Sequence, residues 1–258
     1  MAFGPNLADL NNTASTLIAG RAFELMGIPK SRVVDFTIAS LQAEPDDYEG
    51  PGNSRRPAQG AALEAGLERD LVESLDGDRW EVSRSKVASD YAQYQHLAEL
   101  QRAIGENPEL RIYAAGDYAV KTDVMVGVKG VAGSAVLPLH AAVSSKLTLR
   151  SDRAQNVRTE FAVLVRNRRG RAPHLVVVTA EPHPGRLISL ARGTGEIDAV
   201  YHLLFEPIAA ALDDLVERQD HHHATLQSLR EQRSRWAEMV AGRRLRPYEE
   251  LCQVIGGS

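Results

Sequence analysis

The chain has 258 residues, of which 25% are charged and 43% are hydrophobic, and its formal net charge is −4. This is the profile of an ordinary soluble globular protein with enough length for a real hydrophobic core. The single cysteine, Cys252, excludes an internal disulfide framework and fits a reducing cytoplasm. We expect no signal peptide at residues 1–12 and no membrane-spanning segment, because no long uninterrupted apolar run is present.

The first third of the chain predicts two helices separated by a long loop. Apolar residues recur at helical spacing over 12–27, and 33–38 is a short β-prone run. Residues 42–60 are rich in Pro, Gly, Asp and Asn, which indicates a loop. A second helix is expected over 61–75, where leucine recurs every four residues.

The next elements are expected to be a strand at 80–83, a helix at 87–104 and two strands within 111–127. Asp123 stands out among them as a polar residue inside an apolar strand. Burying a carboxylate is costly unless a cation or a metal ion accompanies it. Asp123 is therefore a candidate functional carboxylate.

The stretch 144–160 carries the densest chemistry of the chain. Residues 146–149 alternate like a strand, and a helix should follow from about Asp152 or Arg153 to Val165. Arg153 and Glu160 are seven residues apart, so they should share one face of that helix.

The segment 146–171 is strongly basic although the whole chain is acidic. It holds eight lysine or arginine residues against two acidic residues. A concentrated basic segment is suited to binding phosphate groups, and the whole-chain charge does not argue against this. A solvated basic face explains such a run equally well when it is considered alone.

The apolar run 174–180 predicts a strand buried on both sides of a mixed or parallel sheet. Residues 181–186 are expected to form a loop at its end, with Arg186 near the tip. The remaining expected elements are a short helix at 187–191, a glycine turn at 193–195, apolar structure at 197–204, helices at 207–217 and 223–241, and a polar tail at 242–258. No internal repeat is present, so we predict one α/β domain over 1–258 with a mixed central β-sheet flanked by helices.

Glu64, Asp123, Lys146 and Glu160 together are the working parts of a metal-dependent phosphodiesterase. Carboxylates at adjacent strand ends can hold one or two Mg²⁺ ions, which activate water and neutralise charge on the phosphate. A lysine in the same cleft can orient the water and stabilise the transition state. Each residue is weak evidence alone, and Glu64 could equally be an ordinary first-turn glutamate favoured by the helix dipole.

These residues resemble the restriction-endonuclease superfamily with the signature Pro-Asp … Asp/Glu-X-Lys. Thr122 stands in place of the proline before Asp123, and Ser144 stands in place of the acid two residues before Lys146. The NgoMIV-type group of type II restriction endonucleases supplies that acid from the following helix, where Glu160 stands. Its hallmark Lys-X-X-X-Arg-Ser-Asp-Arg … Glu is present at 146–160, and the resemblance covers about 116–202.

The resemblance implies a restriction-endonuclease-like fold, with Asp123 and Glu160 as Mg²⁺ ligands, Glu64 in support and Lys146 beside them. It also implies a bacterial, cytoplasmic homotetramer, a dimer of dimers, that cuts double-stranded DNA at a palindromic CCGG-containing site, GCCGGC in type, and leaves 5′-phosphate ends. Arginine pairs well with guanine O6 and N7, and a carboxylate accepts from cytosine N4. The expected base-reading residues are Arg150, Asp152, Arg153, Arg186 for the outer base pair, and Gln59.

Other functions fit fewer of these residues. A Ser-Lys amide hydrolase built on the Ser-Ser-Lys run at 144–146 leaves Asp123, Glu160 and the Arg-Ser-Asp-Arg run without a role. A non-catalytic DNA-binding protein needs the arginines but neither Lys146 nor Glu160. The turn at 193–196 lacks the later glycines and lysine of a phosphate loop, and the histidines at 221–223 lack partner ligands for a metal.

Overall fold

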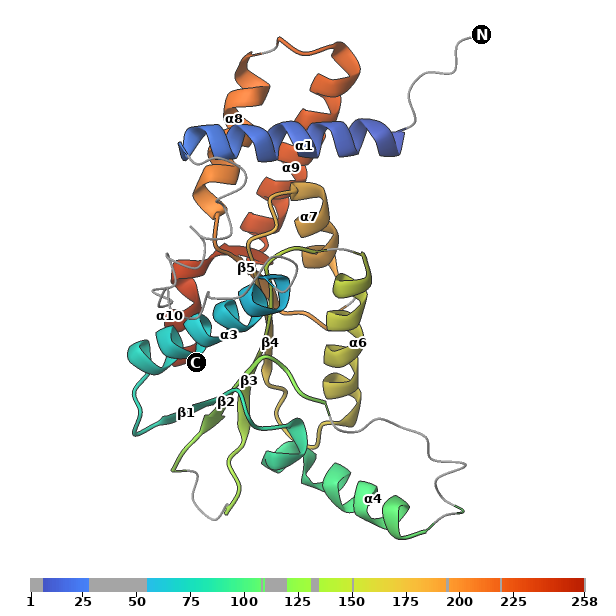
Figure 1. Ribbon diagram of the computed structural model, residues 1–258, viewed down its shortest axis with the longest axis vertical. Helices are drawn as coiled ribbons and strands as arrows, with labels where there is room; N and C mark the ends of the chain where they lie inside the picture. The colour runs from blue at the N-terminus through green and yellow to red at the C-terminus, as the bar shows by residue number, and fades with distance from the viewer. Residues whose placement is uncertain are drawn as a thin grey trace.

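The computed structural model describes residues 7–27, 55–107, 109, 120–130, 135–149, 151–193, 195–218 and 220–257 (Figure 1). Its centre is a six-stranded sheet in the order β1-β2-β3-β4-β5-β6. The strands are β1 (Trp80–Ser83), β2 (Val124–Val128), β3 (Leu139–Lys146), β4 (His174–Thr179), β5 (Ala199–His202) and β6 (Leu245–Pro247). Strands β1 to β3 pair antiparallel and β3 to β6 pair parallel. The predicted α/β class with a mixed sheet is confirmed.

Helices cover both faces of the sheet. They are α1 (Leu7–Leu25), α3 (Arg55–Ser74), α4 (Gln95–Glu106), α6 (Ser151–Asn167), α7 (Pro184–Arg192), α8 (Phe205–Arg218), α9 (His223–Ala241) and α10 (Leu251–Gly256). Short 3-10 turns lie at 88–90, 92–94 and 248–250. Figure 1 shows α6 on one side of the strands and α3 with α10 on the other.

Alternation along the strands divides the core into two clusters. Ala142 and Val177 belong to the larger cluster, which includes buried residues of α1, α6, α7, α8 and α9. Their neighbours Val143 and Val176 belong to the smaller cluster, with buried residues of α3 and α10. Because β3 continues in regular register to its end, Lys146 lies on the same face as Ala142, the face covered by α6.

Several helix boundaries differ from those predicted. Helix α3 starts at Arg55, so the predicted loop 42–60 is wrong for 55–60. Pro57 permits this because a proline in the first turn of a helix gives up no intrahelical hydrogen bond. The helix predicted at 87–104 is a pair of 3-10 turns followed by α4. The β-prone run 33–38 and residues 111–119 lie outside the described part of the chain.

Two strand predictions are also corrected. Residues 147–149 are not a strand, because β3 ends at Lys146 after pairing with β2 and β4. The predicted polar tail 242–258 contains β6 and α10. Leu245 is fully buried opposite Val200 of β5, and Leu251 packs into the smaller core cluster. Within the described ranges, no helix is long and apolar enough to cross a membrane.

The start of β3 is anchored by one buried amide side chain. Gln93 donates from Nε2 to the Leu139 carbonyl at 2.8 Å and accepts from the Leu139 N–H at Oε1, also at 2.8 Å. Gln93 is only 6% exposed, so these backbone groups have little access to water as a substitute partner. The amide therefore fixes where the strand that carries Lys146 begins.

Gln93→Met should lower the free energy of unfolding by about 1–3 kcal/mol, because it leaves buried backbone groups of Leu139 unsatisfied. Urea denaturation measures this change. Gln95→Met is the matched control, since Gln95 is exposed two residues away. Equal effects of the two substitutions would refute the anchoring role.

Candidate active site

An aspartate and a lysine meet where β2 begins and β3 ends. Asp123 lies in a bend immediately before β2, so the prediction that it sits inside a strand is wrong. The Lys146 Nζ donates to Asp123 Oδ2 at 2.7 Å, and both side chains are about one-fifth exposed. Antiparallel pairing of Val124 with Val143 brings these two strand ends together.

Asp123 is oriented through one of its two carboxylate oxygens. Oδ2 also accepts from the Ser145 backbone N–H at 2.6 Å, and more weakly from the hydroxyls of Ser144 and Ser145 at 3.3 and 3.4 Å. No described residue donates to Oδ1. The serine that replaces the acid two residues before Lys146 thus helps to hold the aspartate, and one hard oxygen stays available for a cation.

Glu160 comes to the same place from the third turn of α6. It is half-buried, and its charge interacts with those of Lys146 and Asp123. Burial raises the pKa of the Glu160 carboxyl above its ordinary value; the Lys146 ammonium opposes this and the Asp123 carboxylate adds to it. A desolvated carboxylate beside another carboxylate gains stability when a cation joins the pair.

Asp123 and Glu160 fit a divalent metal ion by their chemistry, because Mg²⁺ prefers hard oxygen ligands and usually takes one or two protein carboxylates. A third carboxylate is not brought to them: among the described residues, no three His, Cys, Asp or Glu side chains are grouped to hold a metal. Glu64 lies on α3, which covers the opposite face of the sheet, and its Oε2 is 3.3 Å from Arg84 Nη2. Its support of the metal site stays a prediction.

Two of the predicted base-reading residues, Asp152 and Arg153, lie in the first turn of α6. Asp152 is exposed in the first turn, and Arg153 donates from Nη1 to the Thr148 hydroxyl at 3.2 Å. Arg150 lies outside the described residues, as does the side chain of Gln59, whose backbone is in the first turns of α3. In the sequence, only the connection 147–150 and the first two residues of α6 separate Lys146 from Arg153.

Arg186 lies in the first turn of α7, so its predicted place at a loop tip is wrong. The helix begins at Pro184, whose fixed φ suits the first helical position. The Arg186 Nη1 atom is 3.4 Å from both carboxylate oxygens of Glu181. Glu181, the residue before Pro182, is completely buried in the structure. The sequence analysis did not identify it as a candidate site residue.

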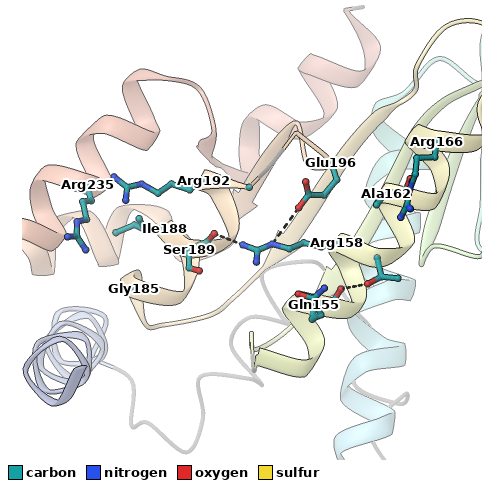
Figure 2. A pocket seen from close by; sticks show the side chains of 12 residues that line it. Gln155, Arg158, Ala162, Arg166, Gly185, Ile188, Ser189, Arg192, Glu196 and Arg235 are labelled. Atoms are coloured by element: carbon teal, nitrogen blue, oxygen red, sulfur yellow. Dashed lines mark hydrogen bonds and ion pairs between the residues drawn. The ribbon is translucent and has the colours of Figure 1, made fainter. Parts of the chain in front are cut away.

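A separate basic groove of about 700 Å³ lies between α6 and α7 (Figure 2). Its arginines are Arg158, Arg166, Arg192 and Arg235, and none of Asp123, Lys146 and Glu160 lines it. Arg158 Nη2 donates to the Ser189 carbonyl at 2.6 Å, and its Nε is 3.6 Å from Glu196. The contacts of Arg158 within this groove therefore connect α6 to α7, at a place separate from the Asp123–Glu160 carboxylate pair.

The rival chemistries gain no support from this geometry. A Ser-Lys hydrolase needs a neutral lysine beside the serine hydroxyl, whereas the Lys146 ammonium is paired with Asp123. The three histidines at 221–223 belong to no group of potential metal ligands in the part of the chain that the structure describes. The turn near Gly193 ends α7, because the Gly193 N–H donates to the Leu190 carbonyl at 3.2 Å.

Comparison with known proteins gives a match to the family model described as NgoMIV restriction enzyme, over residues 129–252. The chain is also similar to the type II restriction enzyme NgoMIV of Neisseria gonorrhoeae. The two are 44% identical over 149 aligned residues, which cover 48% of this chain and 52% of the relative. The chain thus spans about half the length of the curated relative that it matches. Lys146, Glu160 and Arg186 fall inside the family match, while Glu64 and Asp123 lie before it.

The raised pKa of Glu160 makes stability depend on pH in a defined direction. A carboxyl whose pKa is higher in the folded state binds protons more tightly there, so its ionisation lowers stability as pH rises through that pKa. In metal-free buffer, Glu160→Gln should therefore be more stable than the wild type at neutral pH, and the difference should vanish in acid. Urea denaturation across pH measures it.

Mg²⁺ should reverse the order at neutral pH, because it stabilises the wild type by binding the carboxylate pair and stabilises the Glu160→Gln variant less. Glu73→Gln, at an exposed position on α3, is the matched control and should show neither effect. A wild type that is more stable than the variant in metal-free neutral buffer would contradict the assignment.

Proposed function

We propose that this chain is a type II restriction endonuclease of the NgoMIV family, which cuts double-stranded DNA at specific palindromic sites. The match of residues 129–252 to the family model and the 44% identity to the NgoMIV enzyme support the proposal. One observation carries the proposal. Lys146 at the end of β3 pairs with Asp123, and the half-buried Glu160 of α6 interacts electrostatically with both. The Arg-Ser-Asp-Arg run lies between Lys146 and Glu160 in the sequence, so groups suited to phosphodiester hydrolysis flank groups suited to reading bases.

Asp123 and Glu160 would hold the metal, with Mg²⁺ as the proposed ion and Glu64 in a supporting role. When bound, the ion would supply positive charge next to the phosphate and make water easier to deprotonate. Lys146 donates one N–H of its ammonium group to Asp123, which leaves two N–H groups for other partners. Those groups can orient an attacking water and stabilise negative charge on the phosphate, giving 5′-phosphate and 3′-hydroxyl ends.

The proposed site contains CCGG, with GCCGGC as the complete sequence. Arg150 and Arg153 would each pair with O6 and N7 of one guanine, and Asp152 would accept from the cytosine amino groups. The hydrogen bond from Arg153 to the Thr148 hydroxyl, within the β3–α6 connection, would help to orient the guanidinium for this contact. Arg186 would read the outer base pair, and Gln59 is a further candidate contact.

We propose a bacterial, cytoplasmic homotetramer built as a dimer of dimers, with 1–258 forming one domain. A palindromic site has twofold symmetry, which a symmetric pair of subunits matches by presenting the same residues to each half-site. The single cysteine is consistent with a reducing compartment. A non-catalytic DNA-binding protein is the alternative, and it differs in needing no carboxylate pair.

A DNA cleavage assay distinguishes the proposed endonuclease from a non-catalytic DNA-binding protein. Wild-type protein with plasmid DNA and Mg²⁺ should give discrete fragments, and Asp123→Ala should slow cleavage at least about 100-fold while retaining DNA binding. Gel analysis of the digests and a binding assay in Ca²⁺ measure the two properties. Asp78→Ala, at an exposed turn, is the control. No cutting by the wild type in either Mg²⁺ or Mn²⁺ would refute the nuclease.

Base reading by Arg153 is tested by binding to otherwise identical duplexes with and without CCGG. Arg153→Ala should weaken binding to the CCGG duplex by roughly 5- to 150-fold, as expected for loss of one bidentate contact. Arg102→Ala is the matched control, because that arginine is 75% exposed on α4, where it pairs with Glu106. An unchanged preference for CCGG in the Arg153 variant would overturn the assignment.

A further inference from the structure

We propose that Glu181 is a positioning residue for specificity, which locks the CCGG-reading segment and Arg186 to each other. The inference rests on the proposed function and adds to it a residue with no assigned role. Glu181 follows β4, and its carboxylate is completely buried at the carboxyl ends of the parallel strands. Ligands of open α/β sheets bind at this edge.

The buried carboxylate joins two segments that are distant in sequence. Its Oε2 accepts from the Leu149 backbone N–H at 2.6 Å, and its Oε1 accepts from the His183 backbone N–H at 3.0 Å. Leu149 is the residue before Arg150, where the Arg-Ser-Asp-Arg run begins. His183 caps the start of α7, three residues before Arg186. One side chain thus sets the spacing between both groups of proposed base-reading residues.

Arg186 completes the arrangement. Its Nη1 lies 3.4 Å from each Glu181 oxygen, and its side chain is 48% exposed whereas that of Glu181 is 0% exposed. Glu181 therefore holds the Arg186 guanidinium from its buried side, while about half of the Arg186 side chain is exposed. Arginine loses much side-chain entropy when it is fixed by a ligand, and a buried partner removes part of that cost in advance.

The backbone of Glu181 is itself fixed, so the carboxylate cannot easily follow a moving partner. Its N–H donates to the Thr179 hydroxyl at 3.2 Å, and its carbonyl accepts from His202 Nε2 at 2.8 Å. His202 Nδ1 accepts from the Leu204 N–H, which defines the neutral tautomer. Burial lowers the pKa of His202 to about 4, so this support persists across the neutral range.

A glutamine at this position cannot reproduce the arrangement. Its amide has one accepting oxygen, so either the Leu149 or the His183 N–H would face an NH₂ group instead of an acceptor. It would also lose the charge that holds Arg186. Glu181→Gln should therefore loosen both the segment proposed to read CCGG and Arg186, which is proposed to read the outer base pair. Arg186→Ala should affect recognition of the outer base pair alone.

The experiment measures kcat/KM on three duplexes: GCCGGC, one altered in the outer pair and one altered in the inner CCGG. Glu181→Gln should reduce discrimination against the outer change by roughly tenfold or more, the size expected for one bidentate contact, and should also reduce discrimination against the inner change. In the Arg186→Ala background, Glu181→Gln should cost no further outer discrimination, since that contact is already gone. An equal loss of kcat/KM on all three duplexes, with ratios unchanged, would overturn the proposal.

Glu196→Gln is the matched control. Glu196 is a nearly buried glutamate that pairs with Arg158 across the other junction of α6 and α7, away from the connection that carries Leu149. Hydrogen exchange over 147–153 gives a readout without DNA: protection should fall in the Glu181 variant and not in the Glu196 variant. Unchanged protection would count against the proposal even if the wild type cut no DNA, so its failure is distinct from failure of the proposed function.

Glu181→Asp provides a second variant, which keeps the charge but is too short to reach both segments. It should lower the same discrimination ratios. If neither variant folded by circular dichroism, Glu181 would be a structural residue of the core, and the positioning role would be withdrawn.

Discussion

Parallel pairing of β3, β4 and β5 is the constraint on which the rest of the site depends. The register places Lys146 beside Thr179 and Thr179 beside His202, so three strands end in one row. Each of these residues then supports something at that edge: Lys146 pairs with Asp123, and Thr179 and His202 hold Glu181. A slip of one residue in β3 would turn Lys146 to the α3 face and separate it from α6.

The carboxylates of Asp123 and Glu160 have similar chemistry but different environments, and this difference would favour the binding of a cation. Asp123 is satisfied at Oδ2 by a lysine and a backbone N–H, which fixes its direction. Glu160 accepts no hydrogen bond from the described residues and is desolvated, which raises its pKa. Asp123 is thus positioned, and Lys146 offsets the desolvation of Glu160 only in part, so a cation between the two carboxylates would meet one preset ligand and stabilise the other.

Sequence periodicity was sufficient for the buried elements. The strand at 174–179 and the helix at 223–241 are where their apolar patterns predicted them. Local signals failed at β6, which is a strand because β5 offers it a partner. Arg186 had a local signal that the prediction missed, because Pro184 can begin a helix. Glu181 could not be identified in advance, since its partner Leu149 is 32 residues away.

The nearness of Lys146 to the run proposed to read bases would limit how the site responds to DNA. Only 147–150 connect β3 to α6, and Leu149 within them is held by a buried carboxylate. A shift of α6 that improved contact with a base would therefore also move Glu160 relative to Asp123. Asp152 and Arg153, proposed to read bases, and Glu160, proposed to bind the metal, all lie on that helix. A DNA sequence that displaced α6 would then misplace a proposed metal ligand as well. With both proposed roles on α6, discrimination in binding and discrimination in cleavage would share one origin, the position of that helix.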